Sequence, residues 1–143
     1  MRPYPIRTLM VAVLLTCTFA AAQNHDAAPS KFNEATIAQL QADMAAGKLT
    51  SVELTEFYLT RIFLLDQKGP GVNSVIQLNP YALALARNAD VMRRHGASGP
   101  LLGIPVLLKD NIDTGDKMQT TAGSFALFGM PALQDSTVAA NLR

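Results

Sequence analysis

The stretch GIPVLLKDNIDTGDKMQTTAGS, residues 103–124, decides the fold, because an apolar run within it ends abruptly at a lysine followed by two polar side chains. A surface strand alternates apolar and polar side chains, whereas a strand covered on both faces is apolar throughout. Residues 104–108 (IPVLL) follow the second pattern. We therefore predict a buried strand over 104–108, with Lys109 at its end.

Two amphipathic helices are predicted on the N-terminal side of this strand. Apolar residues spaced three and four apart begin at Ile37, and Gly47 is a suitable terminator of that helix. Thr50 and Glu53 have capping-box spacing and open a second helix, which the Gly-Pro-Gly break at 69–71 ends. The apolar stripe of the second helix is Leu54, Tyr58, Ile62 and Leu65.

A second strand and two further helices follow in the pattern. The β-branched content of residues 72–78 (VNSVIQL) predicts a short strand, and Asn79-Pro80 opens a helix that ends at Gly96. The predicted buried stripe of this helix is Leu85, Ala89 and Met92. Asp135 or Ser136 is expected to cap a last helix that carries Val138 and Leu142.

The order of these elements predicts an α/β fold that is incomplete in this chain. Helices alternate with two strands, but two strands cannot build the sheet that such a pattern requires, and both would keep open edges. The last predicted helix also stops before a normal length. We expect the chain to be the front part of a larger domain.

Composition excludes several classes of protein. The chain has 143 residues, of which 49% are hydrophobic and 16% charged, as in a globular protein. The net charge is only +1, and the sequence has no basic run beyond Arg93 and Arg94. We therefore expect no binding to nucleic acid and no electrostatic attraction to an anionic membrane surface.

The first residues are predicted to be a secretory signal peptide, residues 1–22. Arg2 and Arg7 precede the apolar run LMVAVLL, and small residues precede a cleavage site after Ala22. The apolar run is too short to favour a permanent membrane anchor. Lipid attachment at Cys17 is the disfavoured alternative, because Thr16 is bulkier than the residue usually found before a lipidated cysteine. The mature protein would then be periplasmic or extracellular, with a linker at 23–32 and a domain at 33–143.

The segment GPLLGIPVLLKDNIDTGDKMQTTAGSFAL, residues 99–127, resembles the N-terminal part of the amidase signature family. A weaker resemblance extends back through residues 50–66 and 72–86 to about Phe32. The resemblance implies a mixed sheet covered by helices. It also implies hydrolysis of an amide by a Ser, cis-Ser, Lys triad, in which Lys109 corresponds to the lysine that accepts a proton through the bridging serine. Outside this resemblance, the spacing favours a lysine whose stem is buried and whose ammonium reaches water over a catalytic base.

The two serines of the triad belong to a Gly/Ser-rich stretch that this chain lacks. Ser124 and Ser136 have local explanations as turn or cap residues, and neither is assigned as nucleophile. Lys109 is thus the single triad member expected here, and the chain alone should be inactive.

Polar residues around Lys109 form the remaining candidate site. Asp110 and Asn111 either terminate the strand through local hydrogen bonds or use the same bonds to position Lys109. The polar turn that the resemblance places near the active site contains Thr120, Thr121, Gly123 and Ser124. No metal and no organic cofactor are implied.

The expected activity is that of a secreted hydrolase of small amides or peptide amides, with bacterial peptide amidases as the nearest resemblance. Two alternatives stay open: the A-type amidotransferase component that transfers ammonia onto a misacylated tRNA, and a non-catalytic exported protein with a binding or structural role. The signal peptide favours the hydrolase over the amidotransferase, because the tRNA substrate is cytoplasmic. The oligomeric state is not predicted.

Overall fold

Helices α1 and α2 begin where the sequence places polar caps. A computed structural model describes residues 32–143, and α1 spans Ile37–Ala45 while α2 spans Ser51–Arg61. At the start of α2, the Thr50 hydroxyl accepts the backbone N–H of Glu53 at 3.1 Å, and the Glu53 carboxylate accepts the backbone N–H of Thr50 at 2.8 Å. This reciprocal pair is the predicted capping box, and both helices are confirmed.

Helix α2 continues into a wider helical turn and a sharp reversal. The π-helix η1 spans Ile62–Gln67 and forms the last part of the predicted second helix. Asp66, at its end, accepts the backbone N–H groups of Ser74 at 2.8 Å and Val75 at 3.1 Å, together with the Ser74 hydroxyl. These bonds, led by the Ser74 hydroxyl, hold the pKa of Asp66 below its usual value. The reversal thereby fixes Ser74 and Val75 in the segment 72–78 that follows.

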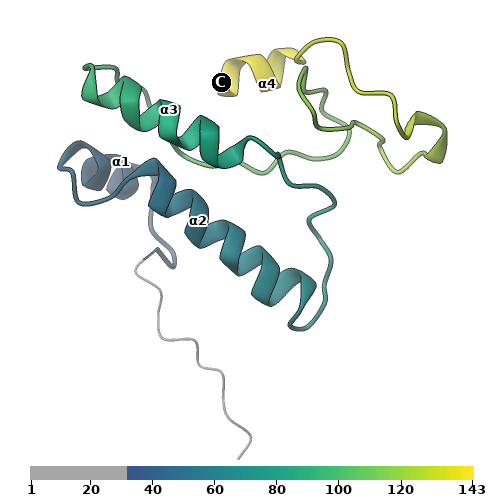
Figure 1. Ribbon diagram of the computed structural model, residues 1–143, viewed down its shortest axis with the longest axis horizontal. Coiled ribbons are helices and arrows are strands. Elements are labelled where there is room, and N and C mark those ends of the chain that lie inside the picture. The colour runs from purple at the N-terminus through teal and green to yellow at the C-terminus, as the bar shows by residue number, and fades with distance from the viewer. Residues whose placement is uncertain (1–31) are drawn as a thin grey trace, which may run out of the picture. The chain divides into compact units, whose positions relative to one another are not determined.

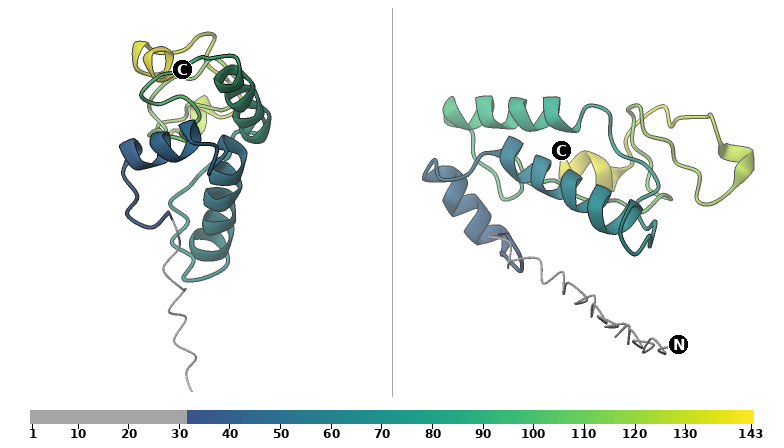
Figure 2. Two further views of the ribbon diagram at one scale, coloured as in Figure 1. Left: turned by 90° about the vertical axis from the view of Figure 1, so that its left-hand side faces the viewer. Right: turned by 60° about the horizontal axis from the view of Figure 1, so that its bottom comes forward.

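Helix α3, Ala82–Arg94, lies beside α2 and runs in the opposite direction (Figure 1, and again in both views of Figure 2). The buried side chains of α3 are Ala86 and Ala89, whereas Leu85 and Met92 are exposed. The predicted stripe was therefore right at Ala89 and wrong at the two larger residues. Alanines at the contact let the backbones of α2 and α3 approach closely, so the helix turns its smaller side chains inward.

A small apolar core joins the helices. Its buried side chains in the described part of the chain are Leu40, Met44, Leu49, Leu54, Ala86, Ala89 and Ala139. The carboxylate of Asp90 on α3 accepts the N–H groups of Ser51 at 2.7 Å and Val52 at 3.2 Å, so α3 satisfies free donors at the start of α2. The Arg93 guanidinium donates to the Gln41 side chain at 2.7 Å and to the Leu102 carbonyl at 2.8 Å. This arginine links α1, α3 and the loop that leads to residues 103–124.

The two predicted strands are not formed. Residues 32–143 contain no strand, and both 72–78 and 104–108 lack regular structure. Burial of the second segment was also wrong, because Val106 is 47% and Leu107 73% exposed. A strand exists only as part of a hydrogen-bonded ladder, and no backbone hydrogen bond joins the two segments. The sheet expected for the fold class is therefore absent from the described residues.

The C-terminal helix α4, Thr137–Leu142, is short. Ser136 caps it by accepting the N–H of Ala139 at 3.2 Å, which confirms one of the two predicted caps. A 3-10 turn, η2, spans Phe125–Leu127. Among the described helices, none has the length and apolarity needed to cross a membrane. The predicted signal peptide, Cys17 and nearly all of the predicted linker lie outside the described residues.

Candidate active site

Lys109 lies at the surface, one residue beyond the irregular segment 104–108. Its carbonyl accepts the backbone N–H of Ile112 at 3.0 Å, which turns the chain at this point. Within residues 32–143, the Lys109 side chain makes no recorded hydrogen bond or ion pair. The predicted position at the end of a buried strand is wrong for this chain, because the segment before Lys109 has no covering layer.

Asp110 connects the residues next to Lys109 with the polar turn at 120–124. Its carboxylate accepts the Thr121 hydroxyl at 2.5 Å and the Thr121 backbone N–H at 3.3 Å. The Asp110 carbonyl also accepts the N–H of Ala122 at 2.9 Å. The sequence predicted only local hydrogen bonds for Asp110, but Asp110 also binds Thr121, eleven residues further along the chain. This bond connects the backbone next to Lys109 with the polar turn.

The polar turn has an unusual backbone. Ala122 has a φ of +48° and Gly123 a φ of +76°, so two successive residues are left-handed. Glycine adopts this conformation freely, but for alanine it costs roughly 1–2 kcal/mol. Such strain persists only where surrounding contacts hold it, and here those contacts come from Asp110. The turn is therefore maintained by a bond to the neighbour of Lys109.

The other predicted site residues have simpler surroundings. The Thr120 hydroxyl makes a long hydrogen bond of 3.5 Å to the Ile112 carbonyl. Ser124 donates its backbone N–H to the Thr121 carbonyl at 2.7 Å, as expected of a turn residue. Asn111 is exposed, and the structure records no partner for it among the described residues. The chain thus brings Asp110 together with Thr121, Ala122 and Gly123, and leaves Asn111 apart.

Acid should release the bond between Asp110 and the polar turn. The Thr121 hydroxyl, followed by nearby backbone N–H groups, holds the pKa of Asp110 below its usual value. A lowered pKa in the folded state means that this contribution to stability is present above the ordinary carboxyl pKa and is lost as the pH falls through the lowered value. We expect NMR titration of the Asp110 carboxyl carbon to give a midpoint below 3.8. Thr121→Val, which removes the hydroxyl, should raise that midpoint, and an unchanged midpoint would contradict the assignment.

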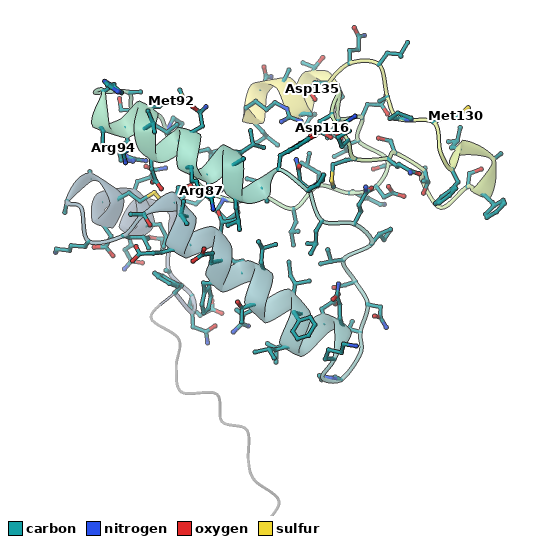
Figure 3. The ribbon with its side chains drawn as sticks, viewed as in Figure 1. Arg87, Met92, Arg94, Asp116, Met130 and Asp135 are labelled. Atoms are coloured by element: carbon teal, nitrogen blue, oxygen red, sulfur yellow. The ribbon has the colours of Figure 1, made fainter. Side chains whose placement is uncertain are left out.

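A second polar cluster, which the sequence did not reveal, supports the loop that follows Lys109. The Arg143 guanidinium donates to Asp116 and to Asp135, each at 2.7 Å, and Figure 3 shows these two aspartates near α4. Asp135 also accepts the N–H of Gly115 at 2.8 Å. Asp135 was one of the two predicted caps of the last helix, and it instead connects that helix to the loop. The turn-forming sequence Thr114-Gly115-Asp116 could have marked one side of this cluster.

Gly115 should be sensitive to substitution because the chain passes very close to it. A Cβ atom at this position would lie 2.8 Å from the Cα of Gln134 and 2.9 Å from the backbone nitrogen of Asp135. Backbone atoms cannot swing away as a side chain can, so Gly115→Ala should lower the free energy of unfolding by about 1–3 kcal/mol in urea denaturation. Gly99→Ala is the matched control, since its Cβ would make only an ordinary 3.8 Å contact with Leu102. Equal stability of the two variants would disprove the close approach.

An open depression of about 380 Å³ lies beside the second cluster and is lined by Tyr81, Gly115, Asp116, Lys117, Gln119 and Pro131. It is separate from the residues predicted from sequence. Within the described range 32–143, no group of three or more His, Cys, Asp or Glu residues is placed to hold a metal ion.

Comparison with known proteins places the candidate site in a matched segment. The profile of the family described as Amidase matches residues 53–143, which include Lys109 and the polar turn. A probable amidase of Arabidopsis thaliana is 38% identical over 141 residues, which are 96% of this chain and 27% of that protein. A glutamyl-tRNA(Gln) amidotransferase subunit from Thioalkalivibrio sulfidiphilus is 44% identical over 107 residues, 74% of this chain and 21% of that protein.

A solved structure agrees with these matches. The chain superposes on the peptide amidase of Stenotrophomonas maltophilia with a TM-score of 0.76 and 48% sequence identity, over 79% of this chain and 23% of the other. The helices described above therefore have the arrangement of the corresponding part of that enzyme. The chain spans only 18% to 27% of the length of the first curated relatives that it matches.

Proposed function

Because the chain belongs to the amidase signature family, we propose that it is part of a secreted amidase that hydrolyses the C–N bond of a peptide amide or small amide, with Lys109 as the base. The observation that carries this proposal is the likeness to a peptide amidase at 48% identity over the segment that contains Lys109. A peptide amide is therefore the first substrate to test. The products would be a carboxylate and ammonia.

The proposed chemistry uses Lys109 as a neutral amine. Lys109 would accept the proton of a bridging serine as that serine takes the proton of a nucleophilic serine, whose oxygen attacks the amide carbonyl. Backbone N–H groups would stabilise the oxyanion of the tetrahedral intermediate. The proton then returns along the same path to the leaving nitrogen, so ammonia departs and an acyl-serine remains. Water next hydrolyses the ester, with its proton following the same route.

Both serines are proposed to lie in parts of the protein other than this chain, because no Gly/Ser-rich stretch occurs in the sequence. The exposure of Lys109 supports the same proposal. In the proposed site Lys109 would be enclosed by the rest of the domain, whereas its side chain is exposed here. We therefore expect this chain alone to be inactive.

Asp110 is proposed to position Lys109 rather than to react. Its bonds to Thr121 and Ala122 fix the backbone directly after the lysine, within a turn that includes a strained left-handed alanine. Asn111 is proposed to support Lys109 from the next position along the chain. Thr120, Thr121, Gly123 and Ser124 would then lie on the substrate side. Holding a base through hydrogen-bonded neighbours reduces the reorganisation needed during reaction.

Amide hydrolysis can be tested in a hybrid enzyme. We define the hybrid amidase as the Stenotrophomonas maltophilia peptide amidase in which the matched segment is replaced by the corresponding residues of this chain. Incubation with a C-terminal peptide amide should release ammonia and give the free peptide acid, whereas the 143-residue chain alone should release none. A hybrid amidase that folds normally but releases no ammonia would refute the proposal.

The amidotransferase alternative rests on the 44% identity to a glutamyl-tRNA(Gln) amidotransferase subunit. The two candidates differ in cellular location, because we propose that residues 1–22 direct export. Fusion of these residues to a reporter enzyme that becomes active only outside the cytoplasm should give active reporter, cleaved after Ala22. A reporter that stays uncleaved in the cytoplasm would favour the amidotransferase. An active hybrid amidase would in turn exclude the non-catalytic binding protein.

A further inference from the structure

Residues 110–121, which we call the connecting loop, run from the candidate base into the polar turn. The loop is closed at its base, where the Asp110 carboxylate accepts the Thr121 hydroxyl and the Thr120 hydroxyl donates to the Ile112 carbonyl at 3.5 Å. A surface loop opens locally when few bonds hold it, so the persistence of this closure depends on the residues in between.

Asp116 holds the middle of the connecting loop through both of its carboxylate oxygens. One oxygen accepts the Thr114 hydroxyl at 3.1 Å and the Met118 backbone N–H at 2.8 Å, so the loop curls around this side chain. The other oxygen accepts the Asn79 side-chain amide at 3.2 Å and the Arg143 guanidinium at 2.7 Å. The first pair of donors belongs to the loop itself, whereas the second pair comes from the segment before α3 and from the end of α4. Asp116 therefore fixes both the shape of the loop and its attachment to the helices.

The Asp116 carboxylate is well placed to keep these bonds at neutral pH. Its side chain is only 17% exposed, so water competes little for the bonds. Burial by itself would raise the pKa of this carboxyl, but the hydrogen bonds that it accepts, led by that from Arg143, outweigh burial and hold the pKa below its usual value. The group is therefore ionised at neutral pH and can accept from both pairs of donors.

Arg143 attaches the loop to α4 by a second path. Its Nε donates to Asp135 at 2.7 Å, and Asp135 accepts the Gly115 N–H at 2.8 Å. The backbone N–H of Ser136 donates to the Asp113 carbonyl at 3.0 Å, so neighbouring residues at the start of α4 hold two positions of the loop. The planar guanidinium donates in two fixed directions at once and thus connects both aspartates.

We propose that Asp116 and Arg143 are positioning residues for amide hydrolysis, which hold the connecting loop so that Lys109 and the polar turn keep the spacing that the reaction requires. The proposal rests on the proposed function above, in which Lys109 is the base and the polar turn lies on the substrate side. Asp116 and Arg143 act through the loop rather than at the reacting atoms. A base must lie within hydrogen-bond reach of the proton that it accepts, and a misplacement of about 1 Å can cost about 10²-fold in rate.

Hydrogen exchange in the 143-residue chain can measure the coupling without any activity. The backbone N–H groups of Thr121 and Ala122 donate to Asp110, so their exchange reports how often the base of the connecting loop opens. The backbone N–H of Leu54 donates to the Thr50 carbonyl in α2 and reports opening of the helical core. Comparison of the two sites separates local opening of the loop from a general loss of stability.

Two variants break the attachment of the loop. Asp116→Asn has one acceptor oxygen in place of two, so it can keep only one of the two pairs of bonds, and Arg143→Ala removes both links to α4. Each should speed exchange at Thr121 and Ala122 at least about fivefold, while the rate at Leu54 stays the same. Unchanged exchange at the two loop amides, or an equal acceleration at Leu54, would overturn the proposal.

The same variants in the hybrid amidase test the effect on the reaction. We expect kcat for a peptide amide to fall at least about tenfold while KM changes less than about threefold, because the substrate still binds but the base is displaced from it. A purely structural role would lower the amount of folded enzyme and leave kcat per folded molecule unchanged. The matched control is Arg94→Ala, since Arg94 is an exposed arginine of the same family match at the end of α3, away from Asp116 in Figure 3.

Arg143→Lys provides a milder change in case Arg143→Ala does not fold. The lysine keeps the positive charge, but its ammonium lacks the two fixed donor directions of the guanidinium, so kcat should still fall at least about threefold. Wild-type kcat in both Arg143→Lys and Asp116→Asn would overturn the positioning role, as would an equal loss in Arg94→Ala.

The outcomes also separate this inference from the proposed function. A hybrid amidase that is active, and that stays fully active in the Asp116 and Arg143 variants, overturns the positioning role and leaves the proposed function intact. A folded hybrid amidase that releases no ammonia refutes the proposed function and with it the positioning role, even where exchange in the isolated chain shows that Asp116 and Arg143 hold the loop.

Discussion

Lys109→Ala in the hybrid amidase is expected to lower kcat/KM for a peptide amide by about 10²- to 10⁴-fold, the usual contribution of a positioned general base. The fold should be unaffected, because Lys109 is exposed and its side chain makes no recorded hydrogen bond or ion pair among residues 32–143. The loss should therefore appear in ammonia release while the urea denaturation midpoint stays the same.

Lys109→Arg tests the protonation state that the proposal requires. A guanidinium remains charged at any pH that a protein tolerates and cannot accept a proton, so this variant should lose nearly as much activity as Lys109→Ala. Lys68→Ala is the matched control, because Lys68 is an exposed lysine inside the same family match. Retention of activity by Lys109→Arg would mean that positive charge, rather than proton transfer, is what position 109 supplies.

Leu54→Ala is expected to cause the largest loss of stability, about 2–5 kcal/mol in the free energy of unfolding. Leu54 is completely buried, at 0% exposure, where α2 packs beside α3. Removing three carbon atoms there costs transfer free energy and leaves a cavity that the surrounding structure fills only in part. Small domains have a total stability of about 5–15 kcal/mol, so the variant should be close to unfolding. Urea denaturation of the 143-residue chain, followed by circular dichroism, measures the change.

Leu85→Ala is the control for Leu54→Ala and tests the rotation of α3. The sequence pattern predicted a buried Leu85, but the side chain is exposed, and the structure buries Ala86 and Ala89 in its place. Truncation of an exposed leucine within a helix should change stability by less than about 0.5 kcal/mol. A loss equal to that of Leu54→Ala would show that the sequence pattern, and not the structure, gives the inward face of α3.

Local sequence determined the helices of this protein. Thr50 and Glu53 lie three residues apart, and the hydrogen bonds that they exchange form as soon as that turn forms, so the start of α2 could be predicted from spacing alone. At the start of α4 the sequence left Asp135 and Ser136 as alternative caps, and the structure assigns the cap to Ser136. The motif around Lys109 also indicated the family, because that inference needs only the residues themselves.

Only the tertiary structure decided which face of α3 is buried, that Asp110 binds Thr121, and that the two predicted strands do not form among the described residues. Leu85 and Ala86 fit a helical stripe equally well, and the choice depends on which side chains let α2 approach. The bond from Asp110 to Thr121 closes a loop whose path the sequence does not specify. A strand depends on a neighbour from any part of the fold, so the apolar pattern of 104–108 predicted the composition of a buried strand but could not supply the partners that bury it.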